Sequence, residues 1–281
     1  MANTQAQSSA PLRAQHLGTL LGRIQVHTAG SGPAMVCWPS LLMTGNMWRA
    51  QAEHFGGSYR MVLIDPPGHG GSDALTRHFT LEECADSLVQ ILDQLAIPDC
   101  ILVGNSWGGM MGGLFAALHP QRTRAAVLMN CTASAAGWYQ KFEYSLLTGI
   151  VRRLRTIPDV LVQRAVTAFT GETTERTKPD VVHTIRSSVA GVDTRSVCWA
   201  IESVVTRRTD HLARLRTIQR PVLVVAGEED RTFPVAETRA MADAITGSRF
   251  KVLPGVGHLA ALEAPQAVNA AISDFLQDAA P

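Results

Sequence analysis

The sequence of 281 residues predicts an α/β fold in which helices flank a mostly parallel sheet of eight strands and an inserted helical cap covers it. Short, almost wholly apolar runs alternate with segments of helical periodicity. Runs such as Val222-Leu223-Val224-Val225 leave no polar face, which is typical of strands buried on both sides in a parallel sheet. The alternation breaks between about residues 138 and 211, where helical segments occur without a strong strand pattern. This break predicts the cap.

The individual elements follow from apolar runs and from their boundaries. The strands are expected at residues 16–21, 23–28, 34–38, 60–64, 100–103, 125–129, 221–226 and 249–253. Core helices are expected at residues 44–54, 80–95, 106–119, 235–245 and 265–277. The second helix has the clearest start, because Thr80 and Glu83 have the spacing of a capping box.

Three regions are expected along the chain. Residues 1–15 are polar and lack the apolar stretch of a secretion signal, so they predict a disordered tail. Residues 16–136 and 212–281 form the core, and residues 137–211 form the cap. The region from residue 138 to 211 contains 11 Lys or Arg against 8 Asp or Glu, which indicates either a solvated basic face or a mild attraction for an anionic substrate.

Composition excludes several functions. A formal net charge of +1 argues against nucleic acid as the main partner. The sequence has no run of 18 apolar residues, so no membrane span is expected. Five cysteines without a C-x-x-C pair indicate free, buried thiols and a cytoplasmic location. The nine histidines show no metal-ligand spacing, so neither a metal nor another cofactor is expected.

The segment Gly104-Asn105-Ser106-Trp107-Gly108 carries the strongest functional signal. It follows an apolar strand-like run and opens a helix rich in small residues, which is the context of a G-x-S-x-G nucleophile elbow. Glycines two residues before and after the serine let the backbone make a sharp turn. The pattern predicts that Ser106 projects from the sheet as a nucleophile.

A serine hydroxyl needs a general base, and the base needs an orienting carboxylate. His258 follows the last expected strand, and Asp230 follows the strand before it, so both should reach the sheet edge at which Ser106 lies. The chain order of serine, acid and histidine is that of one known arrangement of the triad. Glu228 and Glu229 compete for the acid position, and Asp230 is preferred for its register and its short side chain.

The chain resembles the α/β-hydrolase-fold superfamily, in its serine-nucleophile branch, from about residue 16 to 276. The acid loop of that superfamily, G-x-x-D-x-x-x-P, is matched by Gly227, Asp230 and Pro234, and the histidine motif G-x-G-H ends at His258. The resemblance implies a catalytic triad of Ser106, Asp230 and His258 that works without a cofactor.

The resemblance also implies an oxyanion hole made by two backbone N–H groups. One should belong to Trp107, directly after the nucleophile, and the other to Leu41 in the loop after the third strand. Most members carry His-Gly in that loop, whereas this chain has Pro39-Ser40. The stretch from Ser40 to Trp48 resembles the corresponding loop of 3-oxoadipate enol-lactonases.

A substrate pocket is expected between core and cap, with an apolar lining that favours a small molecule with a hydrophobic portion. For the cap aromatics, plain packing of helices remains an alternative. The residues expected to contact substrate are Ser40, Leu42, Trp138, Trp199, Phe233 and Leu259.

The predicted function is hydrolysis of a carboxylic ester or lactone through an acyl-enzyme. One alternative is hydrolysis of a carbon–carbon bond, because Gly104-Asn105-Ser106 resembles the elbow of meta-cleavage-product hydrolases. Those enzymes usually carry a Trp shortly after the catalytic histidine, whereas Leu259 follows His258 here. A non-hydrolytic ligand receptor or lyase of the same fold is the other alternative.

Overall fold

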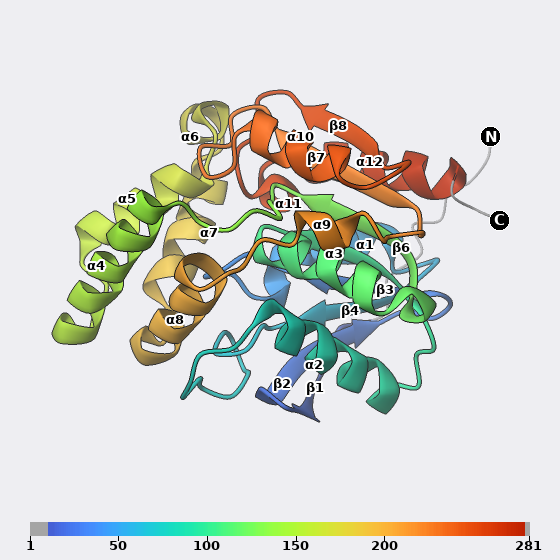
Figure 1. Cartoon of the computed structure of the whole chain (residues 1–281), viewed down its shortest axis with the longest axis horizontal. Helices are drawn as coiled ribbons and strands as arrows, with labels where there is room; N and C mark the ends of the chain where they lie inside the picture. Colours follow the sequence, from blue (N-terminus) through green and yellow to red (C-terminus); the bar gives the residue numbers. More distant parts are fainter. Residues whose placement is uncertain (1–10, 279–281) are drawn as a thin grey trace.

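A sheet of eight strands forms the centre of the computed structural model, which describes residues 11–278 (Figure 1). The strand order is β1-β2-β4-β3-β5-β6-β7-β8. β2 is antiparallel to both of its neighbours, and the strands from β4 to β8 run parallel. The predicted fold class is therefore confirmed. The strands are β1 Arg13–Thr19, β2 Gly22–Ala29, β3 Ala34–Trp38, β4 Arg60–Ile64, β5 Cys100–Asn105, β6 Thr123–Met129, β7 Val222–Gly227 and β8 Arg249–Leu253.

The first strand begins earlier than the sequence predicts. Residues 13–15 belong to β1, and Arg13 pairs with Thr28 while Gln15 pairs with Val26. The predicted disordered tail, residues 1–15, therefore wrongly includes the first residues of β1. Residues 1–10 lie outside the described residues. Residues 13–16 of this edge strand are exposed, so they show none of the apolar pattern by which a strand is predicted. Backbone pairing with β2 holds them in the sheet instead.

Core helices surround the sheet in two groups. α3 contacts both α2 and α9, and α1, α11 and α12 form the second group (Figure 1). The predicted capping box is present, because the Thr80 hydroxyl accepts a hydrogen bond from Glu83 N and the Glu83 carboxylate accepts one from Thr80 N. These elements are η1 Gly45–Trp48, α1 Arg49–Phe55, α2 Leu81–Gln94, α3 Trp107–Leu118, η2 Pro120–Arg122, α9 Leu212–Leu215, α10 Val235–Asp243, α11 Ala260–Glu263 and α12 Pro265–Asp278.

The segment between β6 and α9 is helical and lies beside one end of the sheet (Figure 1). It consists of α4 Trp138–Leu154, α5 Asp159–Phe169, α6 Glu172–Thr177, α7 Pro179–Ala190, α8 Thr194–Ile201 and a π-helical turn η3 Glu202–Thr206. We refer to these elements as the cap. The strands β5, β6 and β7 lead toward it and end at Asn105, Met129 and Gly227, so the loops that follow them face the cap.

Candidate active site

The elbow connects β5 to α3 through a single residue. β5 ends at Asn105 and α3 begins at Trp107, so Ser106 alone makes the turn. Its backbone has φ 55° and ψ −112°, a conformation that costs a non-glycine residue of order 1–3 kcal/mol. A side chain at Gly104 would collide with the carbonyl of Gly108, and one at Gly108 with the carbonyl of Trp38. Both glycines are therefore required by close backbone approach.

Hydrogen bonds hold this strained turn in place. Ser106 N donates to the carbonyl of Met129 at 2.8 Å, which ties the elbow to β6. The side-chain amide of Asn105 donates to Ser40 Oγ and to the carbonyl of His258, each at 2.8 Å. Asn105 thus connects the nucleophile turn to the histidine loop, a role that the sequence analysis did not assign.

Asp230 and His258 form a buried pair. His258 Nδ1 lies 2.9 Å from Asp230 Oδ2, and the two residues are 1% and 5% exposed. The carboxylate also accepts hydrogen bonds from the backbone N–H groups of Thr232 and Phe233 and from the Asn130 amide, at 2.7, 3.0 and 3.0 Å. These bonds fix the carboxylate beside Nδ1 of the imidazole. In a neutral ring, a proton on Nδ1 leaves Nε2 unprotonated.

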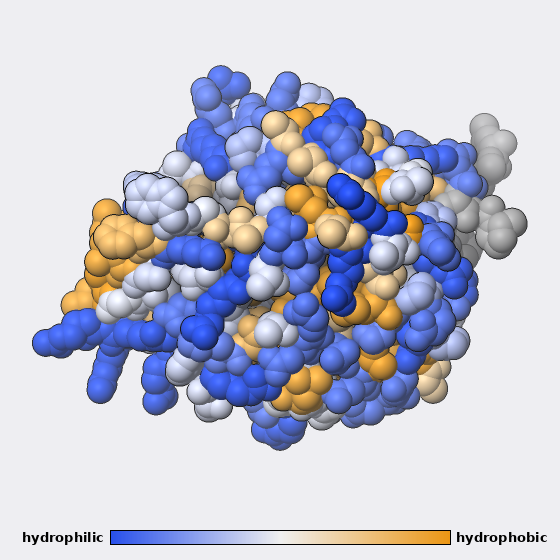
Figure 2. Space-filling model, viewed as in Figure 1, coloured by the Kyte–Doolittle hydropathy of each residue, from blue (hydrophilic) through white to orange (hydrophobic). Residues whose placement is uncertain are grey.

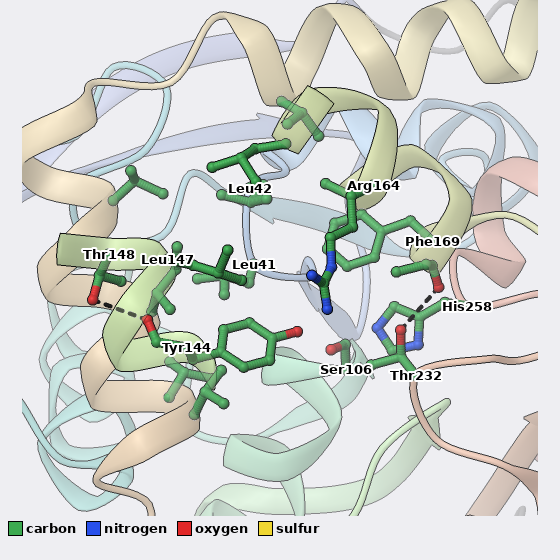
Figure 3. Close-up of a pocket in the computed structure, with 18 of the residues that line it drawn as sticks. Leu41, Leu42, Ser106, Tyr144, Leu147, Thr148, Arg164, Phe169, Thr232 and His258 are labelled. Atoms are coloured by element: carbon green, nitrogen blue, oxygen red, sulfur yellow. Dashed lines mark hydrogen bonds between the residues drawn. The ribbon is translucent and has the colours of Figure 1, made fainter. Parts of the chain in front are cut away.

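Nε2 of His258 faces the candidate nucleophile. This nitrogen is buried and has no hydrogen-bond partner among residues 11–278. Ser106 and His258 line the same pocket, and Figure 3 shows the serine hydroxyl beside the imidazole. The rings of Phe169 and Phe233 flank the imidazole at centre distances of 5.3 and 5.6 Å. Apolar walls of this kind strengthen an electrostatic interaction by excluding water.

Glu263 supports the histidine loop from behind. Its carboxylate is buried and accepts hydrogen bonds from the N–H groups of Gly257 and Leu259, on either side of His258, both at 3.0 Å. It also accepts one from Gly171 N of the cap at 2.8 Å. The only signal in the sequence was a carboxylate five residues after the histidine, which the analysis did not single out.

The predicted oxyanion donors belong to two segments, the loop after β3 and the start of α3. Leu41 lines the pocket, and Trp107 is the first residue of α3, where the positive end of the helix dipole is found. Within residues 11–278, neither backbone N–H donates to another protein group. The two N–H groups thus stay candidates for the oxyanion hole.

The loop that contains Leu41 is a tight turn. Met43 N donates to the carbonyl of Ser40, and Leu42 adopts a positive φ of 66°. Leu42 N donates to Nε2 of His69 at 3.1 Å, and Nδ1 of that histidine donates to the carbonyl of Pro67. Burial lowers the pKa of His69, which keeps the ring neutral and able to accept. The structure thus gives His69 a role in holding the loop.

The pocket lies between core and cap, and its wall is mainly aliphatic (Figure 3). Leu42 and Phe233, two of the six residues expected to contact substrate, belong to this wall. The cap contributes Tyr144, Leu147 and Thr148 of α4, which the sequence analysis did not single out. Among residues 11–278, no Asp or Glu lines the pocket, whereas two arginines do.

The other four expected contacts do not line this pocket. Ser40 is fully buried, and its hydroxyl is occupied by Asn105. Leu259 is also fully buried, behind the imidazole, and its N–H is bound by Glu263. Both positions were placed correctly in their loops, but their side chains pack into the core. They position the site instead of touching a substrate.

The two cap tryptophans were also wrong as pocket residues. Trp138 begins α4 and is 81% exposed, because its helix turns the opposite face to the pocket. Trp199 packs edge-on against His78 at 4.5 Å and lies beneath the Arg152 guanidinium. The exposed face of α4 continues with Phe142 and Leu146, and Figure 2 shows apolar surface at this end of the molecule.

Residues 11–278 contain no cluster of three His, Cys, Asp or Glu side chains that could hold a metal ion. In that same part of the chain, no helix is long and apolar enough to cross a membrane. All five cysteines are free and buried. Burial raises the pKa of the Cys37 and Cys131 thiols, so neither is suited to act as a nucleophile.

Comparison with known proteins agrees with this geometry. The model of a family described as alpha/beta hydrolase fold matches residues 33–265. The chain belongs to that family. It is 26% identical over 248 residues to the protein named 3-oxoadipate enol-lactonase 2 of Acinetobacter baylyi, covering 87% of this chain and 89% of the relative.

Two further relatives widen the range of chemistry. A 2-hydroxy-6-oxononadienedioate/2-hydroxy-6-oxononatrienedioate hydrolase of Cupriavidus pinatubonensis is 26% identical, with 88% of this chain and 84% of the relative covered. The malate-bound structure of a thermophilic esterase from Thermogutta terrifontis superposes with a TM-score of 0.88 at 26% identity, covering 96% of this chain and all of that chain. The chain is therefore an α/β-hydrolase enzyme with enol-lactonase-like relatives.

Proposed function

We propose that this hydrolase cleaves a carboxylic ester or lactone through an acyl-enzyme formed on Ser106. The observation that supports this most directly is the buried Asp230–His258 pair, whose free Nε2 lies in one pocket with a serine on a strained elbow. The likeness to an enol-lactonase and to an esterase supports the same reaction class. The aliphatic pocket wall favours a small substrate with a hydrophobic portion.

The first half of the reaction acylates the enzyme. His258 Nε2 removes the proton from Ser106 Oγ, and the oxygen attacks the substrate carbonyl. Asp230 stabilises the imidazolium that forms. The N–H groups of Leu41 and Trp107 hold the oxyanion, and loss of one such donor costs roughly 3 kcal/mol of barrier.

The second half releases the acid. The imidazolium gives its proton to the leaving alkoxide, which departs as the alcohol or, from a lactone, stays attached as the opened chain. Water then enters beside His258, loses a proton to Nε2 and attacks the acyl carbonyl. The second tetrahedral intermediate collapses, and the proton returns to Ser106 Oγ.

The experiment is hydrolysis of p-nitrophenyl esters from acetyl to decanoyl, together with aliphatic and aromatic lactones. We expect turnover by the wild type and no measurable turnover by Ser106→Ala, with both proteins equally folded by circular dichroism. Ser145→Ala is the matched control, because this serine is exposed on α4, and it should behave like the wild type. Turnover by Ser106→Ala at the wild-type rate would contradict the proposal.

Hydrolysis of a carbon–carbon bond is the second candidate, because the relative from Cupriavidus pinatubonensis is as similar as the enol-lactonase. A dienol diketone that loses its absorbance when the enzyme is added would favour it. A ligand that raises the melting temperature without being consumed would favour the receptor or lyase alternative. We also propose the cytoplasm as the location, since all five cysteines are free.

A further inference from the structure

The pocket contains a buried cation that forms no ion pair within residues 11–278. Arg208, in the segment between η3 and α9, is 6% exposed and lines the same pocket as Ser106. Its Nε donates to the carbonyl of Ser134 at 2.9 Å and its Nη2 to the side-chain oxygen of Gln140 at 3.4 Å. Both acceptors are neutral. Among residues 11–278, no carboxylate oxygen lies within 4.0 Å of the guanidinium nitrogens.

Such an arrangement is costly for a protein. A buried charge is normally paired, because desolvation costs several kcal/mol that two neutral hydrogen bonds do not recover. Burial lowers the pKa of the Arg208 guanidinium, and the attraction of Glu237 opposes this effect only from beyond ion-pair distance. Nη1 has no protein acceptor among the described residues. The guanidinium therefore has both an unbalanced charge and a free donor.

The position of this charge relative to the candidate triad is set by one aromatic ring. The Arg208 Cζ atom lies 5.7 Å from the ring centre of Phe233, and that centre lies 5.6 Å from the centre of the His258 imidazole. Phe233 therefore packs against both the guanidinium and the imidazole. A substrate with its carbonyl at Ser106 and an anionic group at Arg208 would lie along this ring.

A second arginine in the pocket has a different environment. Arg164 of α5 also points into the cavity (Figure 3), but its side chain is 57% exposed and forms an ion pair with Glu143. An anion gains little from a solvated charge that already has a partner. The two arginines therefore make different predictions, and Arg164 serves as an internal control.

We propose that Arg208 binds a carboxylate of the substrate, so that the enzyme prefers esters or lactones that carry a second, anionic carboxyl group a few bonds from the scissile carbonyl. This inference rests on the proposed ester or lactone hydrolysis. The planar guanidinium matches a carboxylate geometrically, and the rest of the pocket accepts the apolar chain. Gln140 and Ser134 then act as positioning residues, since they fix the plane of the guanidinium.

The test compares two esters that differ only in charge. The mono-p-nitrophenyl ester of glutaric acid carries a carboxylate at the end of a five-carbon acyl chain, and p-nitrophenyl pentanoate is its neutral counterpart. We expect the wild type to have the higher kcat/KM on the glutarate ester. In Arg208→Gln the ratio of kcat/KM on the glutarate ester to kcat/KM on the pentanoate ester should fall by at least about 10-fold. Arg208→Lys should retain part of the preference.

A control variant and the behaviour of the wild type separate the possible outcomes. Arg164→Gln should keep the preference, and its loss there instead of in Arg208→Gln would overturn the assignment. A wild type that hydrolyses both esters equally would overturn the inference and leave the proposed function intact. A wild type that hydrolyses neither ester and is not labelled at Ser106 by a fluorophosphonate would overturn the proposed function itself. If Arg208→Gln does not fold, competitive inhibition of the wild type by glutarate, but not by pentane-1,5-diol, decides the question.

Discussion

Replacing Glu263 by Gln should weaken both the fold and the activity of this hydrolase. The buried carboxylate uses both oxygens to accept backbone N–H groups: those of Gly257 and Gly171 on one oxygen and that of Leu259 on the other. A glutamine must place an NH₂ group against at least one of these donors. The same change removes the negative charge that strengthens the remaining bonds.

The magnitude follows from the number of donors affected. One buried N–H without an acceptor costs about 1–3 kcal/mol, so the free energy of unfolding should fall by about 2–3 kcal/mol in Glu263→Gln. For a chain of 281 residues, that corresponds to a decrease in Tm of roughly 3–5 °C. Because the lost bonds flank His258, kcat should also fall at least about 10-fold, since small misplacement of a catalytic group is costly.

Urea unfolding followed by tryptophan fluorescence measures the first effect, and p-nitrophenyl acetate hydrolysis measures the second. Glu229→Gln is the matched control. Its carboxylate also accepts cap hydrogen bonds, from Thr173 N and Oγ1 at 2.7 Å, but none from the backbone beside His258. We expect this variant to retain kcat within about 3-fold. A Glu263→Gln protein as stable and as active as the wild type would refute the reasoning.

Three further predictions follow from particular residues. Ser106→Gly and Ser106→Ala should both be inactive. In urea unfolding, the glycine variant should have a free energy of unfolding about 1 kcal/mol higher than the alanine variant, because glycine removes the strain of a positive φ. Equal stabilities would contradict this. Burial lowers the pKa of His69, so at this residue only the unfolded state gains a proton as the pH falls below about 6.5. Below that pH the free energy of unfolding should therefore fall more steeply for the wild type than for His69→Gln. Parallel plots of stability against pH would contradict this. Burial raises the pKa of Cys37, of Cys131 and of Cys100, the last to about 12. Iodoacetamide at pH 8 should therefore label these thiols only when the protein is unfolded in urea, as peptide mass spectrometry would show. Rapid labelling of the folded protein would count against their burial.

The fold was largely predictable because apolar runs report burial directly. The strands β5, β6 and β7 are buried almost throughout, and their sequences show it. The elbow was predictable for a different reason, since Gly104 and Gly108 are required by backbone contacts that no other residue allows. The early start of β1 was missed because an exposed edge strand is held by backbone pairing and leaves no apolar pattern.

The site was less predictable wherever it depends on the orientation of a helix. Trp138 and Tyr144 belong to the same helix, yet the first is exposed and the second lines the pocket. The sequence analysis chose Trp138 and did not single out Tyr144, because the face that α4 turns to the core is set by packing across long sequence distances. Asn105, Glu263 and Arg208 were missed because their roles depend on partners up to 153 residues away in the chain.

The central claim is that Ser106 carries the acyl group, and trapping this intermediate tests it most directly. The protein is mixed with p-nitrophenyl acetate, quenched in acid within the first turnover and digested for mass spectrometry. We predict one added acetyl group on the peptide that contains Ser106, formed together with a burst of p-nitrophenol and absent from Ser106→Ala. Steady hydrolysis by the wild type with the acetyl group on another residue, or with the same yield in Ser106→Ala, would contradict the account.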